Sequence, residues 1–307
     1  MLRDCLNSIK SQDYPNWEVI VVDAASTDGT PEMISHEFPE VTLIRLKKKI
    51  GVGQAINIGL RKASGEIIAF DLNNDELFPP TWLGTLVNEI QSSAENIVVG
   101  GTRLIHQSKG IVDSAGVKRN YFGQETQIDA GQQIALGMHR NIVDYVGCPV
   151  FHKNLLKEIE NYLTTQYCDE KYVFYFEDTE FCELAKLLGY KIYNIYPAIS
   201  YHRRSATVTT ISAKAYYYLK RGRMRFMIKH FSPFRLLLGT LWWFSTALFD
   251  SVWYSEAVQT IMQRSGIQKT KWEPRSKVVA QAIFWNLTNL KSHFEARKKC
   301  ATIKANH

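Results

Sequence analysis

The sequence predicts an α/β fold with a mostly parallel sheet flanked by helices, followed by a helical extension. Three extended runs rich in β-branched residues, at 18–23, 41–46 and 66–72, alternate with helical patterns at 2–12 and 53–63. Strands that alternate with helices usually pair in parallel, because each crossover returns the chain to the same end of the sheet. The composition, with 45% hydrophobic and 22% charged residues, is typical of a globular protein and excludes a disordered or multi-span chain.

Two acidic residues follow predicted strands. The strand at 18–23 is a nearly continuous apolar run that ends in Asp23, as expected for a buried parallel strand. The turn at 26–31 begins the next helix with a proline in its first turn. The strand at 66–72 is followed by Asp75. Ligands of α/β sheets bind beyond the carboxyl ends of the strands, so these two acids indicate a nucleotide or metal site.

A further acidic pair begins a helix later in the chain. Aromatic residues at 174–176 precede Glu177 and Asp178, and Gly189 ends the helical pattern. The helix dipole favours acidic side chains in a first turn, so an ordinary helix start is the alternative to a catalytic role.

The cysteines indicate a reducing compartment. There are five of them, an odd number, and their spacing matches no metal-binding pattern, so we expect free thiols rather than a disulfide framework. The first residues lack the apolar stretch of a signal peptide.

The stretch 184–249 contains eleven Lys or Arg residues and no Asp or Glu. Such a basic block predicts contact with phosphate groups, in nucleic acid, anionic lipid or a diphosphate-bearing substrate, or else a solvated basic face. Its last part, 236–249, is uncharged and contains Trp242 and Trp243. The run is shorter than the roughly 20 residues of a spanning helix, so we expect an interfacial or re-entrant helix, with a buried core helix as the alternative.

Five motif-like blocks follow one another along the chain. They read Q-x-Y-P-N-W-E-V-I-V-V-D at 12–23 with S-T-D-G-T at 26–30, G-V-G-Q-A-x-N-x-G at 51–59, L-N-N-D-E at 72–76, F-E-D-T-E-F-C at 176–182, and H-R-R-S-A-T at 202–207. In this order the blocks resemble the inverting glycosyltransferases of family 2, which have the GT-A fold. The resemblance covers about residues 1–230, and the last two blocks are similar to the rhamnosyltransferase-like branch.

The resemblance implies a divalent cation, Mg²⁺ or Mn²⁺, that neutralises the departing diphosphate. The Asp-x-Asp motif of the family maps to 73–75, where Asn73 replaces the first carboxylate and Asp75 is the main expected ligand. His202 matches a position that completes the metal shell, and Asp71 is a possible substitute for the missing carboxylate. A helix-capping turn and a structural histidine are the alternatives.

The resemblance also implies a catalytic base and a donor pocket. A carboxylate at the start of the acidic helix takes the proton of the acceptor hydroxyl, and we expect Asp178 to do so, with Glu177 as the second candidate. A neighbouring carboxylate raises the pKa of the base. The residues expected to contact the nucleotide sugar are Asp23, Ser26, Gly51, Gln54, Asn57 and Asn74.

The family begins with an additional strand, before the helix at 2–12 and between the strands at 18–23 and 66–72. Its apparent absence here predicts either a start further upstream or a degenerate copy with a gap in its sheet. We expect a catalytic domain at 1–210 and a helical, membrane-associating extension at 211–307.

The predicted function is transfer of a sugar from a nucleotide-sugar donor to a lipid-linked or polysaccharide acceptor. The alternative is a catalytically impaired homologue that binds nucleotide sugars, as Asn73 and the missing strand would favour. Tyrosines at 216–218 could stack on nucleic-acid bases, but the adjacent apolar run favours a membrane, so no nucleic-acid partner is expected. The predicted location is cytoplasmic and peripheral, at an anionic inner membrane face.

Overall fold

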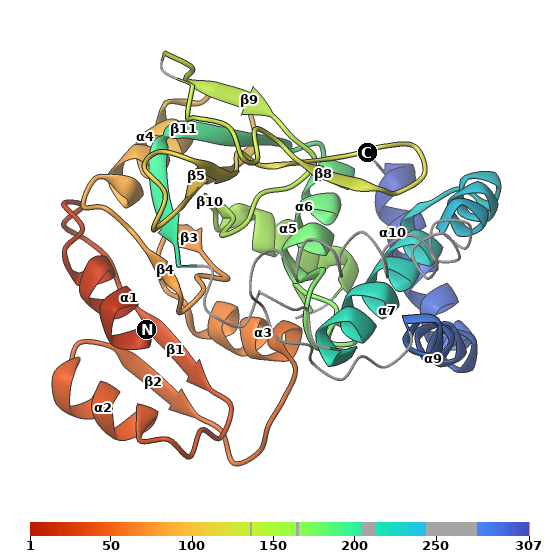
Figure 1. Ribbon diagram of the computed structural model, residues 1–307, viewed down its shortest axis with the longest axis horizontal. Helices are drawn as coiled ribbons and strands as arrows, with labels where there is room; N and C mark the ends of the chain where they lie inside the picture. Colours follow the sequence, from red (N-terminus) through yellow and green to blue (C-terminus); the bar gives the residue numbers. More distant parts are fainter. Residues whose placement is uncertain (136, 164–165, 204–212, 244–274, 307) are drawn as a thin grey trace, which may run out of the picture.

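The computed structural model describes residues 1–135, 137–163, 166–203, 213–243 and 275–306 (Figure 1). The helices and strands predicted in the first 72 residues are present, each within a few residues of its expected bounds. In chain order the elements are α1 (Leu2–Lys10), β1 (Ile20–Asp23), α2 (Thr30–Glu37), β2 (Thr42–Arg45), α3 (Val52–Lys62), β3 (Ile67–Ala69), β4 (Glu76–Leu77), α4 (Trp82–Ser92), β5 (Ile97–Ile105), β6 (Val112–Ser114), β7 (Val117–Arg119), β8 (Glu125–Gln127), β9 (Arg140–Ile142), β10 (Val150–His152), α5 (Asn154–Leu163), α6 (Glu177–Leu187), β11 (Lys191–His202), α7 (Ala213–His230), α9 (Arg275–Thr288) and α10 (Leu290–Asn306).

The central sheet is mixed, rather than mostly parallel as the first part of the sequence suggested. Its strand order is β3-β10-β5-β11-β4, with β6 added to β5 and β9 added to β11. β5 and β11 are parallel, whereas β10 runs antiparallel to both β3 and β5. The expectation of a parallel sheet came from the alternation of strands and helices at the start of the chain. The later strands β4 and β10, which run antiparallel, are only two and three residues long, so the sequence pattern did not reveal them.

β1 and β2 form a separate parallel sheet of two strands (Figure 1). Among the described strands, no ladder joins β1 to β3, the two strands between which the sequence predicts a gap. A side chain makes one connection between the two parts: the Glu18 carboxylate accepts hydrogen bonds from the backbone nitrogens of Ser64, at 2.7 Å, and Gly65, at 3.0 Å.

The core lies on both faces of the central sheet. Consecutive residues of a strand point to opposite faces, and Val98 and Val99 of β5 accordingly belong to different apolar clusters. Val98 packs with side chains of α5 and α6 such as Phe181, whereas Val99 packs with side chains of α4 such as Leu86. Helices therefore cover both faces of the sheet, and the polar site lies at the ends of its strands.

The C-terminal helices share this core. α10 contacts α5, α6 and α7, and its Cys300 and Ile303 belong to the same apolar cluster as Phe181. All five cysteines of the chain are free and buried. The predicted domain boundary at 210–211 stays a prediction, and the described helices beyond it pack directly on the helices that precede it.

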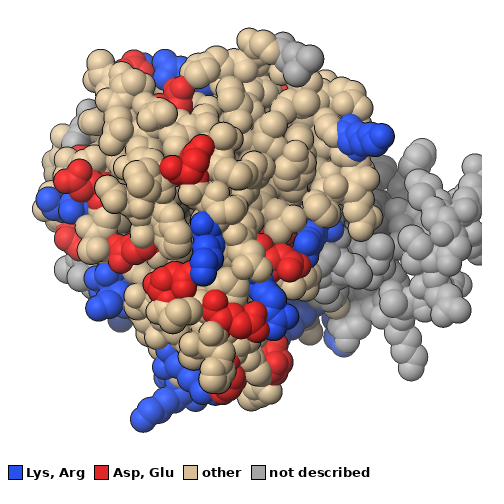
Figure 2. Space-filling view, turned by 90° about the vertical axis from the view of Figure 1, so that its left-hand side faces the viewer, with Lys and Arg blue, Asp and Glu red and all other residues tan. Residues whose placement is uncertain are grey.

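Most basic residues of α7 point inward, which corrects the expectation of a basic outer face. Lys220, Arg221, Arg225 and Lys229 are each no more than 8% exposed. Arg225 and Lys229 both bind the carboxylate of Asp169, at 2.6 and 2.8 Å. Arg225 and Lys229 thus pair with acids of the protein, and the burial of all four cations keeps them from binding anionic lipid. The face with α1 and α2 carries interspersed charges of both signs where it is described (Figure 2).

The apolar run at 236–249 is described as far as residue 243, and the rest lies outside the described residues. Residues 233–243 are helical and expose Phe234, Leu237 and Leu241. Trp242 stacks on Phe122 with ring centroids 5.1 Å apart, and Trp243 is buried. Among the helices that the structure describes, none is both long and apolar enough to cross a bilayer.

Candidate active site

The structure brings Asp75 and His202 together, although they are far apart in the sequence. β4 pairs antiparallel with the end of β11, so that Glu76 lies opposite His202 and Asp75 precedes the pair. The distance between Nε2 of His202 and Oδ2 of Asp75 is 3.2 Å. The backbone nitrogen of Arg203 donates a hydrogen bond to the carbonyl of Asp75, which fixes this corner.

A second carboxylate, which the sequence analysis missed, binds the other nitrogen of the same imidazole. Oδ2 of Asp113 lies 2.8 Å from Nδ1 of His202. Burial by itself lowers the pKa of His202, but the hydrogen bonds to Asp113 and Asp75 outweigh it and raise the pKa to about 9. Asp113 belongs to no block of the family resemblance, and nothing in the sequence around it indicated a site.

The pair of Asp75 and His202 fits a divalent cation. Adjacent ligands of an octahedral ion with bonds of about 2.1 Å are about 3 Å apart. The 3.2 Å between the Asp75 oxygen and the His202 nitrogen agrees with that separation. Asn73 and Asn74 are exposed next to the pair, and Nδ2 of Asn73 donates to Oε1 of Glu76 at 3.4 Å. The oxygen and nitrogen donors present are those that bind Mg²⁺ and Mn²⁺ in proteins.

Three more carboxylates, Asp71, Glu177 and Asp178, form an acidic group near the end of β3. Burial first, and then the charges of Asp71 and Asp178, raises the pKa of Glu177. Burial and then the charge of Asp178 raise the pKa of Asp71 to about 7. Burial also raises the pKa of Asp178, against a hydrogen bond of 2.6 Å from the backbone nitrogen of Thr179. Asp71, weighed from the sequence only as a metal ligand, therefore lies with the two candidate bases.

A strained turn leads into this acidic group. Tyr175 and Phe176 have positive φ angles of 69° and 77°, which bulky L-residues rarely adopt. Asp71 also has a positive φ, of 60°. Strain of this kind costs about 1–3 kcal/mol per residue and concentrates at functional sites. We interpret the turn as the device that directs Glu177 and Asp178 toward Asp71.

Arg103, on β5, interacts both with the neighbourhood of the Asp75–His202 pair and with the acidic group. It was not singled out from the sequence. Its Nη2 lies 2.5 Å from Oε1 of the buried Glu76. Its charge also opposes the rise in the pKa of Asp71 and of Asp178. A Cβ at Gly147 would come within 2.5 Å of the same Nη2, so a larger residue there would displace the guanidinium from its present position.

The residues predicted to bind the nucleotide lie in two other places. Asp23 and Ser26 form a turn after β1, in which the Ser26 nitrogen donates to the Asp23 carboxylate at 3.2 Å. Asn57 is fully buried, and its amide both donates to and accepts from the Cys168 backbone, at 2.8 and 2.9 Å. Gln54 is half-buried on the same helix, α3.

The glycines at the start of α3 allow close packing. A Cβ at Gly51 would lie 2.9 Å from the Val173 backbone, and one at Gly53 would lie 2.9 Å from the Asp169 carbonyl. Together with Asn57, these residues hold the segment that leads into the acidic helix α6. Their contact with a nucleotide stays a prediction.

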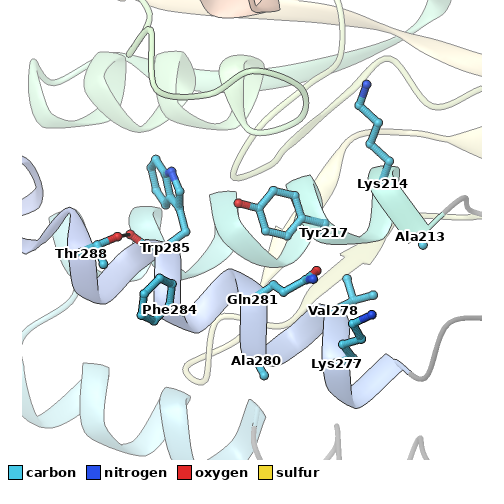
Figure 3. A pocket seen from close by; sticks show the side chains of 10 residues that line it. All are labelled: Ala213, Lys214, Tyr217, Lys277, Val278, Ala280, Gln281, Phe284, Trp285 and Thr288. Carbon is cyan, nitrogen blue, oxygen red and sulfur yellow. Dashed lines mark hydrogen bonds between the residues drawn. The ribbon is translucent and has the colours of Figure 1, made fainter.

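A separate groove of about 790 Å³ lies between α7 and α9 (Figure 3). Its lining combines lysine, aromatic and aliphatic side chains, and no predicted site residue belongs to it. The lining residues are Ala213, Lys214, Tyr217, Lys277, Val278, Ala280, Gln281, Phe284, Trp285 and Thr288.

Similarity to known proteins covers mainly the first part of the chain. GlyA of Streptococcus pneumoniae, a glycosyltransferase, is 34% identical over 36% of this chain and 16% of its own length. The glycosyltransferase AglE of Haloferax volcanii is 32% identical over 36% of this chain and 37% of its own. TuaG of Bacillus subtilis, a putative teichuronic acid biosynthesis glycosyltransferase, is 33% identical over 24% of this chain and 31% of its own. The chain thus matches less than half the length of these relatives.

Two solved structures share the fold. The mannosyltransferase PcManGT from Pyrobaculum calidifontis, in complex with GDP-Man and Mn²⁺, matches 99% of this chain and 83% of its own, with a TM-score of 0.51 and 16% identity. GalNAc-T7 with UDP, GalNAc and Mn²⁺ matches 76% of this chain and 49% of its own, with a TM-score of 0.52 and 13% identity. Residues 1–142 match the model of glycosyl transferase family 2. Residues 1–142 thus match glycosyltransferase family 2, and the chain as described has a GT-A-like fold.

Proposed function

We propose that the chain transfers a sugar from a nucleotide-sugar donor to a glycan or lipid-linked acceptor, with inversion at the anomeric carbon. The observation that carries the proposal is the pairing of Asp75 with His202 at 3.2 Å next to the acidic group of α6, within a family 2 fold. The fold neighbours PcManGT and GalNAc-T7 bind a nucleotide or nucleotide sugar together with Mn²⁺. The same kind of ligand suits the oxygen and nitrogen donors of this site.

Two groups of residues have different roles in this proposal, one in binding the cation and the other in accepting the proton. Asp75 and His202, with Asn73 beside them, would hold Mg²⁺ or Mn²⁺, which supplies the positive charge that the leaving diphosphate needs. Asp178 accepts the proton of the attacking hydroxyl, and burial raises its pKa toward the range of an efficient base. Glu177 is buried, its pKa is raised by that burial and by the charges of Asp71 and Asp178, and it is the second candidate. The positive charge of Arg103 partly offsets the repulsion between Asp71 and Asp178.

We also propose that the acceptor is presented at a membrane, with contacts that differ from those the sequence suggested. Insertion would rest on Phe234, Leu237 and Leu241, which are 65%, 56% and 57% exposed, because most of the α7 cations are buried. The groove between α7 and α9 adds Lys214 and Trp285, a chemistry that suits a lipid phosphate. The relative TuaG is named for teichuronic acid biosynthesis, which supports a role in making cell-envelope polysaccharide. We expect this chain to act at the cytoplasmic face of the membrane.

The test is product formation from a panel of nucleotide sugars that includes activated rhamnose, because the rhamnosyltransferase-like branch stays a prediction. Mass spectrometry should detect a glycosylated acceptor, or free sugar from slow hydrolysis of the donor. Formation of either product should require Mn²⁺. Asp75→Ala should abolish this activity, and Asp13→Asn, at an exposed site, should leave it unchanged. Donor binding without any turnover in the wild type would instead support the catalytically impaired homologue, for which Asn73 provides the chemical reason.

A further inference from the structure

Asp113 occupies a special place in the sheet beside the candidate metal site. The ladder between β5 and β6 pairs Leu104 and Arg103 with the residues on either side of Asp113, so Asp113 is the extra residue of a β-bulge. Bulges redirect the side chain of the extra residue and are frequent next to active sites.

The bulge explains how Asp113 reaches His202. β6 and β11 both pair with β5, on which Leu104 lies opposite a residue of each strand. Neighbouring strands are about 4.8 Å apart, and β5 lies between β6 and β11. A side chain on β6 must therefore extend across β5, parallel to the sheet, to meet one on β11. The Asp113 carboxylate does so and lies 2.8 Å from Nδ1 of His202, with Asp113 itself only 5% exposed.

We propose that Asp113 is a positioning residue, which holds His202 by Nδ1 and thereby directs Nε2 toward a cation shared with Asp75. The proposal rests on the metal site of the proposed function. A histidine can bind a metal through one nitrogen while the other donates a hydrogen bond, and the partner of that bond fixes the ring and the proton position. Here Nδ1 faces Asp113 and Nε2 faces Asp75, at 2.8 and 3.2 Å.

Asp113→Asn tests this role with little change in shape. The new amide can donate to Nδ1, which leaves the proton on Nε2 and blocks the cation. Mn²⁺ affinity of the full chain, measured from the free-ion EPR signal without any nucleotide, should weaken by about 10–100-fold. The matched control is Asp129→Asn, because Asp129 accepts a hydrogen bond of 2.6 Å from Tyr196, another residue of β11. This control should bind Mn²⁺ as the wild type does.

A double-mutant cycle separates positioning from a purely structural ion pair. In a His202→Ala background, which itself binds Mn²⁺ more weakly, Asp113→Asn should have no further effect, because Asp113 acts through His202. A second measurement needs no variant of Asp113: a long-range ¹H–¹⁵N spectrum of histidine-labelled wild type with Mg²⁺ should show the His202 proton on Nδ1. His202→Ala identifies the signal by its disappearance.

The outcomes distinguish the two levels of the argument. Unchanged Mn²⁺ affinity in Asp113→Asn, an equal loss in the His202→Ala background, or a proton on Nε2 overturns the positioning role and leaves the metal site standing. A wild type that does not bind Mn²⁺, or an Asp75→Ala variant that binds it normally, overturns the proposed metal site and the positioning role with it.

Discussion

Lys229→Met tests whether the buried ion pairs of α7 stabilise the packing of the C-terminal helices on the rest of the fold. Lys229, on α7, is buried, and its ammonium group lies 2.8 Å from Oδ2 of Asp169 and binds Oε1 of Glu180 on α6. Methionine keeps the length of the side chain and removes the charge. Asp169 keeps Arg225, and Glu180 keeps His230 at 2.9 Å, so neither carboxylate loses every partner.

The size of the effect follows from this partial compensation. Removal of one partner from a buried ion pair costs about 3–5 kcal/mol, because the remaining charge is left buried. Since both carboxylates retain a cation or an imidazole, we expect a loss near the lower end, about 3 kcal/mol. Lys229→Met combined with Glu180→Gln should be more stable than Lys229→Met alone, because it removes one of the two carboxylates that have lost a partner.

Urea unfolding followed by tryptophan fluorescence measures the change in the free energy of unfolding. Lys214→Met is the matched control, because Lys214 is exposed on the same helix, and it should change stability by less than about 0.5 kcal/mol. If Lys229→Met and Lys214→Met are equally mild, the inward-facing network of α7 does not stabilise the fold and the reasoning is wrong.

Three further predictions concern pH, packing and membranes. Burial raises the pKa of Glu180, but Lys229 and then His230 outweigh it and lower the pKa from 4.5 to about 2. Its contribution is therefore complete above pH 4.5 and is lost as the pH falls toward 2, and urea midpoints across this range should fall less for Glu180→Gln than for the wild type. Gly53→Ala should reduce the free energy of unfolding by about 1–3 kcal/mol in the same assay, because its Cβ would lie 2.9 Å from the Asp169 carbonyl. Gly59→Ala, whose Cβ would lie 3.6 Å from the Val22 side chain, should be neutral or stabilising. Equal effects of the two substitutions would contradict the packing account. The triple variant Phe234→Ser, Leu237→Ser and Leu241→Ser should float less with phospholipid vesicles than the wild type. Ile142→Ser, at another exposed apolar site, should float as the wild type does. If the triple variant still floats, this helix does not make the membrane contact.

The sequence by itself determined the early strands and helices and the residues at their ends. Periodicity and β-branched runs predict local structure, because they depend on which face a side chain presents. Asp75 and the acidic pair Glu177–Asp178 could be named for the same reason, since Asp75 lies in the loop after β3 and the pair begins α6. The match of residues 1–142 to glycosyltransferase family 2 agrees with the family resemblance of the sequence blocks.

Only the tertiary structure decided which distant residues meet. Asp113 and Arg103 carry no local signal, because their roles depend on a bulge in β6 and on the glycine at 147. The composition of α7 suggests a basic surface, yet Arg225 and Lys229 turn inward, where they pair with Asp169 and the buried Glu180. A charge pattern does not record what lies on the other side of a helix, and that contact is set by the packing of α7 against α6 and α10.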